Sequence, residues 1–222
     1  MTRILDFCGC ETSLPSSEAA DAWSKTIQAF LAHGAATPEH LGRTFELAPD
    51  FAQAYAVKGL FSLLLGRAEL VETAWDALRA ARKAASAVVP TARETVYTEA
   101  LQAWLNGKPS VSAKLLDEIL RSTPQDVLAM KLVQAIHFVL GQPKEMRASI
   151  ERILPQYSDH PGLGYLKGCY AFALEETGDY LRAETIGREG LLLCPDDAWG
   201  LHAVAHVYDM TARAEDGLFW LS

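Results

Sequence analysis

The 222-residue chain lacks the features that mark several large classes of protein. Its longest apolar run, around residues 60–65, is far too short to cross a bilayer. The net charge is −8, and no basic stripe is present, which argues against nucleic acid or an anionic membrane as a partner. The first residues contain no apolar core of signal-peptide length. We therefore expect a soluble, cytoplasmic protein.

Cysteine is scarce, and sequence motifs of catalysis are missing. The chain has four cysteines, of which Cys8 and Cys10 are too close for ordinary disulfide geometry and lack a second ligand pair for zinc. Cys169 and Cys194 fall within helical patterns and are expected to be small core residues. A glycine-rich phosphate loop, a nucleophile elbow and a CxxC pair are all absent. We therefore predict no cofactor.

Strand-like alternation of apolar and polar residues is absent as well. Apolar residues recur three and four positions apart almost throughout, which is typical of α-helices. A first helix is expected over about 17–33, with Ser16 or Ser17 as its N-cap. Thr37 and Pro38 are expected to cap and open a second helix that ends near Pro49.

What the chain does contain is a repeated pair of helix-punctuating residues. Five prolines each open a helical stretch, and the residues seventeen positions later are four glycines and one alanine: Pro49 with Gly66, Pro90 with Gly107, Pro124 with Gly141, Pro161 with Gly178, and Pro195 with Ala212. The spacings of 41, 34, 37 and 34 residues between the prolines indicate a helical repeat array. We predict one all-α domain over 1–222, an α-solenoid of antiparallel helical hairpins. A degenerate hairpin is expected over 1–48 and about five repeats over 49–222, the last incomplete.

The C-terminal stretch has an unusual composition for the end of such an array. Residues 215–222 are expected to form a helix that stays apolar as far as Trp220 and Leu221. Terminal repeats normally carry a polar outer face. We therefore expect further repeats, a partner or a second copy of the chain to cover this end.

The repeat pattern resembles the tetratricopeptide repeat. That family needs a small residue on the first helix of each hairpin, and ten residues after the five prolines stand Gly59, Ala100, Gln134, Ala171 and Ala205. Longer strings look like the tetratricopeptide repeat protein 38 family; they include residues 116–120, 126–131, 173–180 and 196–207. This resemblance implies a tetratricopeptide-like superhelix, of which the chain would be the N-terminal half.

The resemblance also implies which residues line the concave groove, at offsets of four, seven, eleven and fourteen from each proline. The first unit supplies an apolar stripe that includes Gln53, Ala56 and Leu60, and we expect an N-terminal helix or a C-terminal portion to fill it. The later units supply the candidate binding residues Tyr97, Trp104, Lys131, Phe138, Tyr165, Phe172, Glu175, Trp199, His202, His206 and Asp209. The aromatic members are either core residues or the wall of a hydrophobic ligand or peptide channel.

Three of these residues, His202, His206 and Asp209, share one face of one predicted helix. They suit a structural or peptide-binding role, a catalytic histidine–carboxylate pair, or a divalent metal site, and Glu175, on the neighbouring stripe, is a further candidate for either of the last two. The zinc-hydrolase signature needs a glutamate after the first histidine, where this chain has Ala203.

We expect a scaffold that binds a peptide, a protein segment or a small ligand in its concave groove. The alternative is a small-molecule hydrolase or lyase, with or without a metal, that uses His202, His206, Asp209 and Glu175. An enzyme would enclose these groups in a pocket, whereas a scaffold would leave them on an open groove.

Overall fold

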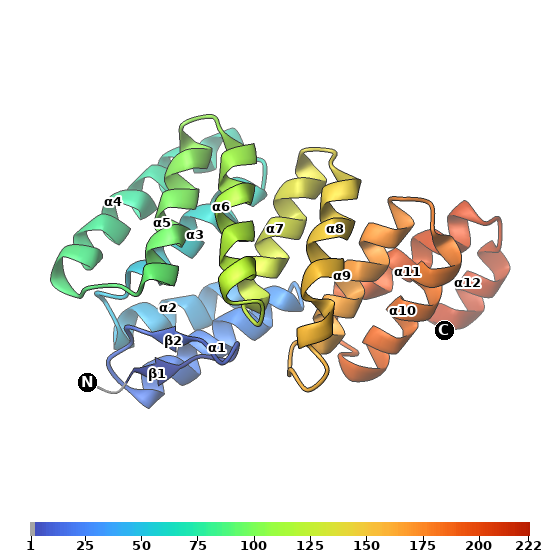
Figure 1. Ribbon diagram of the computed structural model, residues 1–222, viewed down its shortest axis with the longest axis horizontal. Coiled ribbons are helices and arrows are strands. Elements are labelled where there is room, and N and C mark those ends of the chain that lie inside the picture. The colour runs from blue at the N-terminus through green and yellow to red at the C-terminus, as the bar shows by residue number, and fades with distance from the viewer. Residues whose placement is uncertain (1–2) are drawn as a thin grey trace.

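The computed structural model describes residues 3–222, which fold almost entirely into helices (Figure 1). Within these residues the α-helices are α1 (Ser17–Leu31), α2 (Thr37–Leu47), α3 (Ala52–Leu64), α4 (Val71–Ala87), α5 (Ala92–Leu105), α6 (Pro109–Ser122), α7 (Val127–Val139), α8 (Pro143–Ile153), α9 (Leu163–Glu175), α10 (Tyr180–Leu193), α11 (Ala198–Met210) and α12 (Ala214–Leu221). None of them combines the length and the apolar composition that a membrane span requires.

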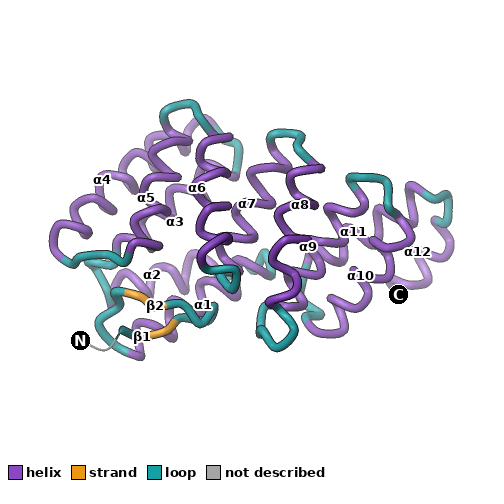
Figure 2. The backbone as a smooth tube through the Cα atoms, viewed as in Figure 1, coloured by secondary structure: helices purple, strands orange, loops and turns teal. Residues whose placement is uncertain are grey.

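Consecutive helices pack against each other as antiparallel hairpins, in a row that runs from α3 and α4 to α11 and α12 (Figure 2). The prediction of an all-α array of hairpins is therefore confirmed. We call the side formed by the first helices of the hairpins, α3, α5, α7, α9 and α11, the inner face. Close approach between neighbouring hairpins uses a small residue, since a Cβ added at Gly59 of α3 would lie 2.5 Å from the Leu101 side chain of α5. At the equivalent position of α7, Gln134 instead donates a hydrogen bond to the Met146 carbonyl at 3.1 Å.

The turns inside the five hairpins share one backbone conformation. Gly66, Gly107, Gly141 and Gly178 have φ angles between 65° and 78°, in the left-handed region that glycine enters without steric cost. Ala212, at the fifth position of the pattern, has the same conformation with φ 56°. A Cβ atom in this region is crowded by the neighbouring backbone, so the last turn is more strained than the other four.

Replacing Ala212 by glycine should therefore stabilise the last hairpin. Removing the Cβ relieves about 1 kcal/mol of left-handed strain, and part of this gain is offset by the greater freedom of the unfolded chain. Amide hydrogen exchange in α11 and α12 should slow in Ala212→Gly. The matched substitution Gly141→Ala should accelerate exchange in α7 and α8 by a similar factor, and equal exchange in both variants and the wild type would contradict the argument.

The structure corrects several expected boundaries. Two short antiparallel strands, β1 (Ile4–Leu5) and β2 (Glu11–Thr12), form a hairpin where no strand was predicted, because two-residue strands are too short to show alternation. The first helix ends at Leu31, two residues before the expected end, and Ser16 caps it by accepting a hydrogen bond from the Ala19 amide. Ala36, rather than Thr37, occupies the N-cap position of α2.

Helix α1 lies on the inner face of the array. Its side chains Trp23, Ile27 and Leu31, spaced four residues apart on one face, are almost completely buried. Trp23 packs edge-on against Phe51 at the start of α3. Phe30, also of α1, stacks on Phe61 of α3. Of the predicted apolar stripe, Gln53, Ala56 and Leu60 are completely buried, whereas its fourth member, Leu63, is partly buried. Helix α1 therefore packs against the early part of the inner face, where we expected an N-terminal helix or a C-terminal portion.

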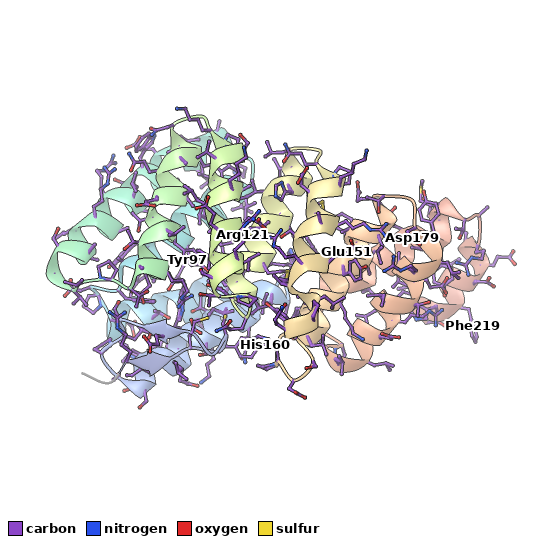
Figure 3. All side chains as sticks on the ribbon, in the orientation of Figure 1. Tyr97, Arg121, Glu151, His160, Asp179 and Phe219 are labelled. Carbon is purple, nitrogen blue, oxygen red and sulfur yellow. The ribbon has the colours of Figure 1, made fainter. Side chains whose placement is uncertain are left out.

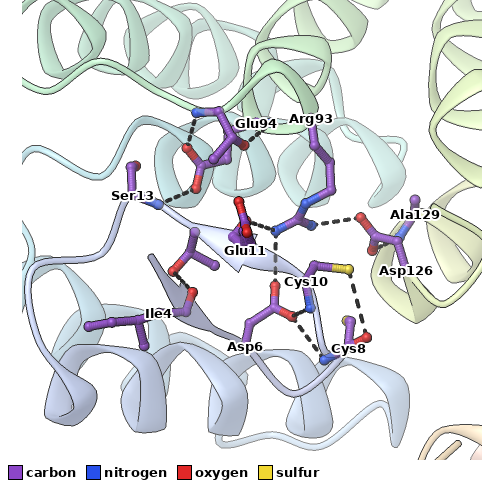
Figure 4. A network of polar contacts seen from close by, with 12 residues as sticks. Ile4, Asp6, Cys8, Cys10, Glu11, Ser13, Arg93, Glu94, Asp126 and Ala129 are labelled. Atoms are coloured by element: carbon purple, nitrogen blue, oxygen red, sulfur yellow. Dashed lines mark hydrogen bonds and ion pairs between the residues drawn. The ribbon is translucent and has the colours of Figure 1, made fainter. Parts of the chain in front are cut away.

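A buried polar network fixes the β-hairpin that precedes α1 (Figure 4). Arg93 of α5 donates one hydrogen bond to Asp6 at 3.0 Å and another to Asp126 at 2.7 Å. Asp6 also accepts the backbone N–H groups of Cys8 and Cys10, while Asp126 caps α7 through the Ala129 amide. The network therefore ties the hairpin to both α5 and α7.

Burial dominates the protonation of Asp6, whose side chain is completely inaccessible to solvent. Loss of hydration raises the pKa of Asp6 from 3.8 to about 6, even though the charge of Arg93 and the hydrogen bonds from Cys8 and Cys10 favour the carboxylate; Asp126 raises the pKa further. Between about pH 4 and pH 6, the folded protein therefore binds a proton at Asp6 that the unfolded chain does not.

Because its pKa is raised in the folded state, Asp6 contributes most to the free energy of unfolding at low pH. That contribution is lost as the pH rises through about 6. Relative to Asp6→Asn, the wild type should gain up to about 3 kcal/mol of unfolding free energy between pH 7 and pH 4. Urea unfolding at several pH values measures this difference. A constant difference between the two proteins would show that Asp6 does not titrate in this range.

The opposite end of the described chain exposes large apolar side chains. Phe219 of α12 is 85% exposed and points away from the array (Figure 3), and its neighbours Leu218 and Leu221 are also exposed. Trp220 is partly buried and packs near the ring of Tyr208. The cover expected for this end from the sequence stays a prediction.

Candidate functional site

The structure separates three of the predicted binding residues from the rest. Tyr97 is completely buried and its hydroxyl donates to the Asp126 carboxylate at 2.9 Å, so it belongs to the N-terminal network. Trp104 is partly buried and packs against the core. Tyr165 is buried and donates to Asp196 at 3.0 Å. It lines a cleft of about 760 Å³ between α1 and the turn that leads into α11.

Most of the remaining predicted residues form one continuous set of rings, which we call the aromatic row: Phe138, Phe172, Trp199, His202 and His206. The ring of Phe172 in α9 is the centre of the row, 5.1 Å from both Phe138 of α7 and Trp199 of α11. The row then continues along α11, because His202 lies 5.7 Å from Phe172 and His206 lies 4.3 Å from His202. Three successive inner-face helices therefore contribute to it.

The aromatic row is partly open to solvent. Phe138 is 45% exposed and both histidines are exposed, whereas Phe172 is almost buried and forms the floor between them. The four-residue spacing of His202 and His206 places their rings one above the other on α11. Asp197 fixes the start of this helix by accepting hydrogen bonds from the backbone N–H groups of Trp199 and Gly200.

Lys131 of α7 lies beneath the row and is only 1% exposed. Its ammonium group is 4.1 Å from the centre of the Trp199 ring, within the range of a cation–π interaction. The nearest carboxylate oxygen, on Asp197, is 3.9 Å away, and the ammonium has no hydrogen-bond partner within residues 3–222. Lys131 therefore packs against the Trp199 ring and offers no exposed charge to a ligand.

His33 is a member of the site that the sequence did not indicate. It follows α1 in a left-handed conformation, with φ 57°, and its ring stacks on Trp199 with the centroids 5.7 Å apart. Desolvation, together with the charge of Lys131, lowers the pKa of His33 from 6.5 to about 4, so the ring is neutral at pH 7. No local signal marks this residue, because the contact joins positions 33 and 199.

The candidate catalytic residues are only partly brought together. His206 Nδ1 lies 3.7 Å from Oε1 of Glu175, which is too long for a hydrogen bond. Burial raises the pKa of Glu175, and the nearby Glu176 raises it further. Burial also lowers the pKa of His202, with His206 as the second cause. In the described part of the chain, Asp209 forms no ion pair, although it is exposed on the same helix.

The metal alternative needs at least three ligands to meet. Over residues 3–222, no group of three or more histidine, cysteine, aspartate or glutamate side chains lies in positions that could hold a metal ion. The arrangement consists instead of exposed ring faces beside the carboxylate of Glu175. Such a surface can bind apolar groups through the rings and a cation through the carboxylate.

No protein-family model matches the chain.

The contact between His33 and Lys131 predicts a titration that NMR can measure. The His33 ring should remain neutral from pH 8 down to about pH 5, because its pKa is lowered to about 4. Lys131→Met removes the neighbouring charge, so the midpoint should rise toward the ordinary value near 6.5 without reaching it, since burial persists. Lys25→Met, on the exposed side of α1, should leave the midpoint unchanged. A His33 midpoint near 6.5 in the wild type would contradict the stacked arrangement.

Proposed function

We propose that this protein is a binding module that holds a peptide segment of a partner protein on its aromatic row. The observation that carries the proposal is the exposure of Phe138, His202 and His206 around the buried ring of Phe172, on an inner face that α1 covers elsewhere. Contiguous exposed rings on a folded surface are typical of interaction sites. Aromatic side chains also supply most of the binding energy at the centres of interfaces.

An open surface favours a peptide over a small ligand. Small-molecule sites enclose most of the ligand, whereas the rings of this row lie side by side across α7, α9 and α11. The row also coincides with the concave groove that the resemblance to tetratricopeptide repeats assigns to the first helices. For the same reason the geometry supports a binding module better than the alternative of a hydrolase or lyase, since His202 and His206 are exposed rather than enclosed.

Selection from a phage-displayed library of random 16-residue peptides tests the proposal. Peptides enriched on the wild-type protein should bind a Phe138→Ala/His202→Ala variant roughly 30-fold more weakly, because two exposed rings at the centre of the contact are lost. Both substitutions are at the surface, so circular dichroism and melting temperature should change little. Affinities of the synthesised peptides are measured by fluorescence anisotropy.

The matched control is Phe219→Ala/His40→Ala, which removes one exposed phenylalanine and one histidine from other parts of the molecule. It should bind the selected peptides as tightly as the wild type does. Failure to enrich any peptide, or equal loss of affinity in both double variants, would refute a peptide-binding role for the aromatic row.

A further inference from the structure

We infer that the bound segment is an amphipathic helix that places an arginine or lysine side chain against Glu175. This inference rests on the proposed function and names the class of peptide that the same site would take. Three features carry it: the way in which the inner face already binds a helix, the length of the aromatic row, and the unbalanced charge beside it.

The inner face binds one helix of the chain itself. Helix α1 has 15 residues and buries Trp23, Ile27 and Leu31 from successive turns, with Trp23 packed against Phe51 at the start of α3. It thus shows that this surface accommodates the apolar stripe of an amphipathic helix. The chain leaves the inner face after α1, where His33 stacks on Trp199, and that same ring is a member of the aromatic row.

The exposed row has the length of a short helix. From Phe138 through Phe172 and His202 to His206, the successive ring centres are 5.1, 5.7 and 4.3 Å apart. These steps limit the span of the row to about 15 Å, which at 1.5 Å per residue corresponds to at most about ten residues of helix, or nearly three turns. Apolar side chains spaced three and four residues apart would therefore meet the row at each turn.

The carboxylate beside the row has no permanent counter-ion, since its nearest ionisable partner is His206, at 3.7 Å, which is charged only when protonated. The Glu175 side chain is only 6% exposed, and its Oε2 atom has no hydrogen-bond partner anywhere in residues 3–222. Among those residues no lysine or arginine pairs with Glu175, Glu176 or Asp209. By contrast, Glu184 on the neighbouring helix α10 pairs with both Arg188 and Arg213.

A carboxylate that is taken out of water without a partner is costly, and a cation from a ligand would offset that cost. An arginine fits this position well, because its guanidinium can pair with the Glu175 carboxylate while its flat face lies over the exposed ring of His206. The acidic chain, with its net charge of −8, would also favour approach of a basic segment.

The test uses the tightest peptide obtained from the 16-residue library, together with three synthetic relatives. The first is a set of peptides in which one basic residue at a time is made neutral. Arginine is replaced by citrulline, its uncharged isostere, and lysine by norleucine. A second carries proline at its centre to prevent a helix. The third is a free arginine amide, which reports whether a small cation alone occupies the site. The proteins are the wild type, Glu175→Gln and the control Glu118→Gln, which removes a charge from an exposed position of α6.

One neutral replacement should weaken binding to the wild type about ten-fold, as expected for a lost charge-assisted hydrogen bond. Glu175→Gln should bind the charged and neutral peptides equally, whereas Glu118→Gln should retain the ten-fold preference. The proline peptide should lose binding to all three proteins, and the arginine amide should bind too weakly to compete at millimolar concentration.

Other results would overturn the inference and leave the proposed function standing. These are a tightest peptide without a basic residue, a charge preference that persists in Glu175→Gln, and full binding of the proline peptide. Competition by the arginine amide as strong as that of the peptide would replace the helix by a small cation as the ligand. If the library yields no peptide at all, the proposed function fails, and this inference fails with it.

Discussion

The packing of α1 against the first helices of the hairpins is the contact on which the rest of the structure depends. Without it, the apolar rings of Phe51 and Phe61, against which Trp23 and Phe30 pack, would be exposed. Apolar contact, rather than hydrogen bonding, holds this seam, since Nε1 of Trp23 and the side-chain amide of Gln53 are buried without partners in the described residues. The specific position of α1 must therefore come from its two ends.

One end is fixed by charge and the other by stacking. Before α1, Arg93 joins the β-hairpin at Asp6 to Asp126, the residue that caps α7. Buried ion pairs of this kind contribute little net stability, because loss of hydration offsets most of the attraction, but breaking one leaves a costly unpaired charge. After α1, His33 stacks on Trp199. The N-terminal helix is thereby placed along the array by contacts to α5, α7 and α11.

The fold was predictable from the sequence because its signals are local. Proline and glycine punctuation located the hairpins, and the offset that fell on Ala212 identified a residue whose backbone adopts the glycine conformation. The β-hairpin was missed because its strands are two residues long. For the candidate site, helical spacing gave the right stripe on α11, but could not separate the buried Tyr97 from the exposed Phe138, because both occupy inner-face positions and only packing distinguishes them. His33 gave no signal at all.

The ring of Trp199 connects the filled and the open parts of the inner face. His33 from the end of α1 stacks on it, Lys131 holds it by a cation–π contact, and Phe172 packs against it from the aromatic row. A helix bound to the row would therefore share one wall with α1 without displacing it. Because Lys131 is buried against Trp199, the groups left to recognise a ligand are the exposed rings and Glu175, whose second oxygen lacks a partner in the described chain. The two parts of the inner face therefore meet at Trp199, where α1 has ended. On one side α1 covers the surface by apolar packing, and on the other side exposed rings and the Glu175 carboxylate remain.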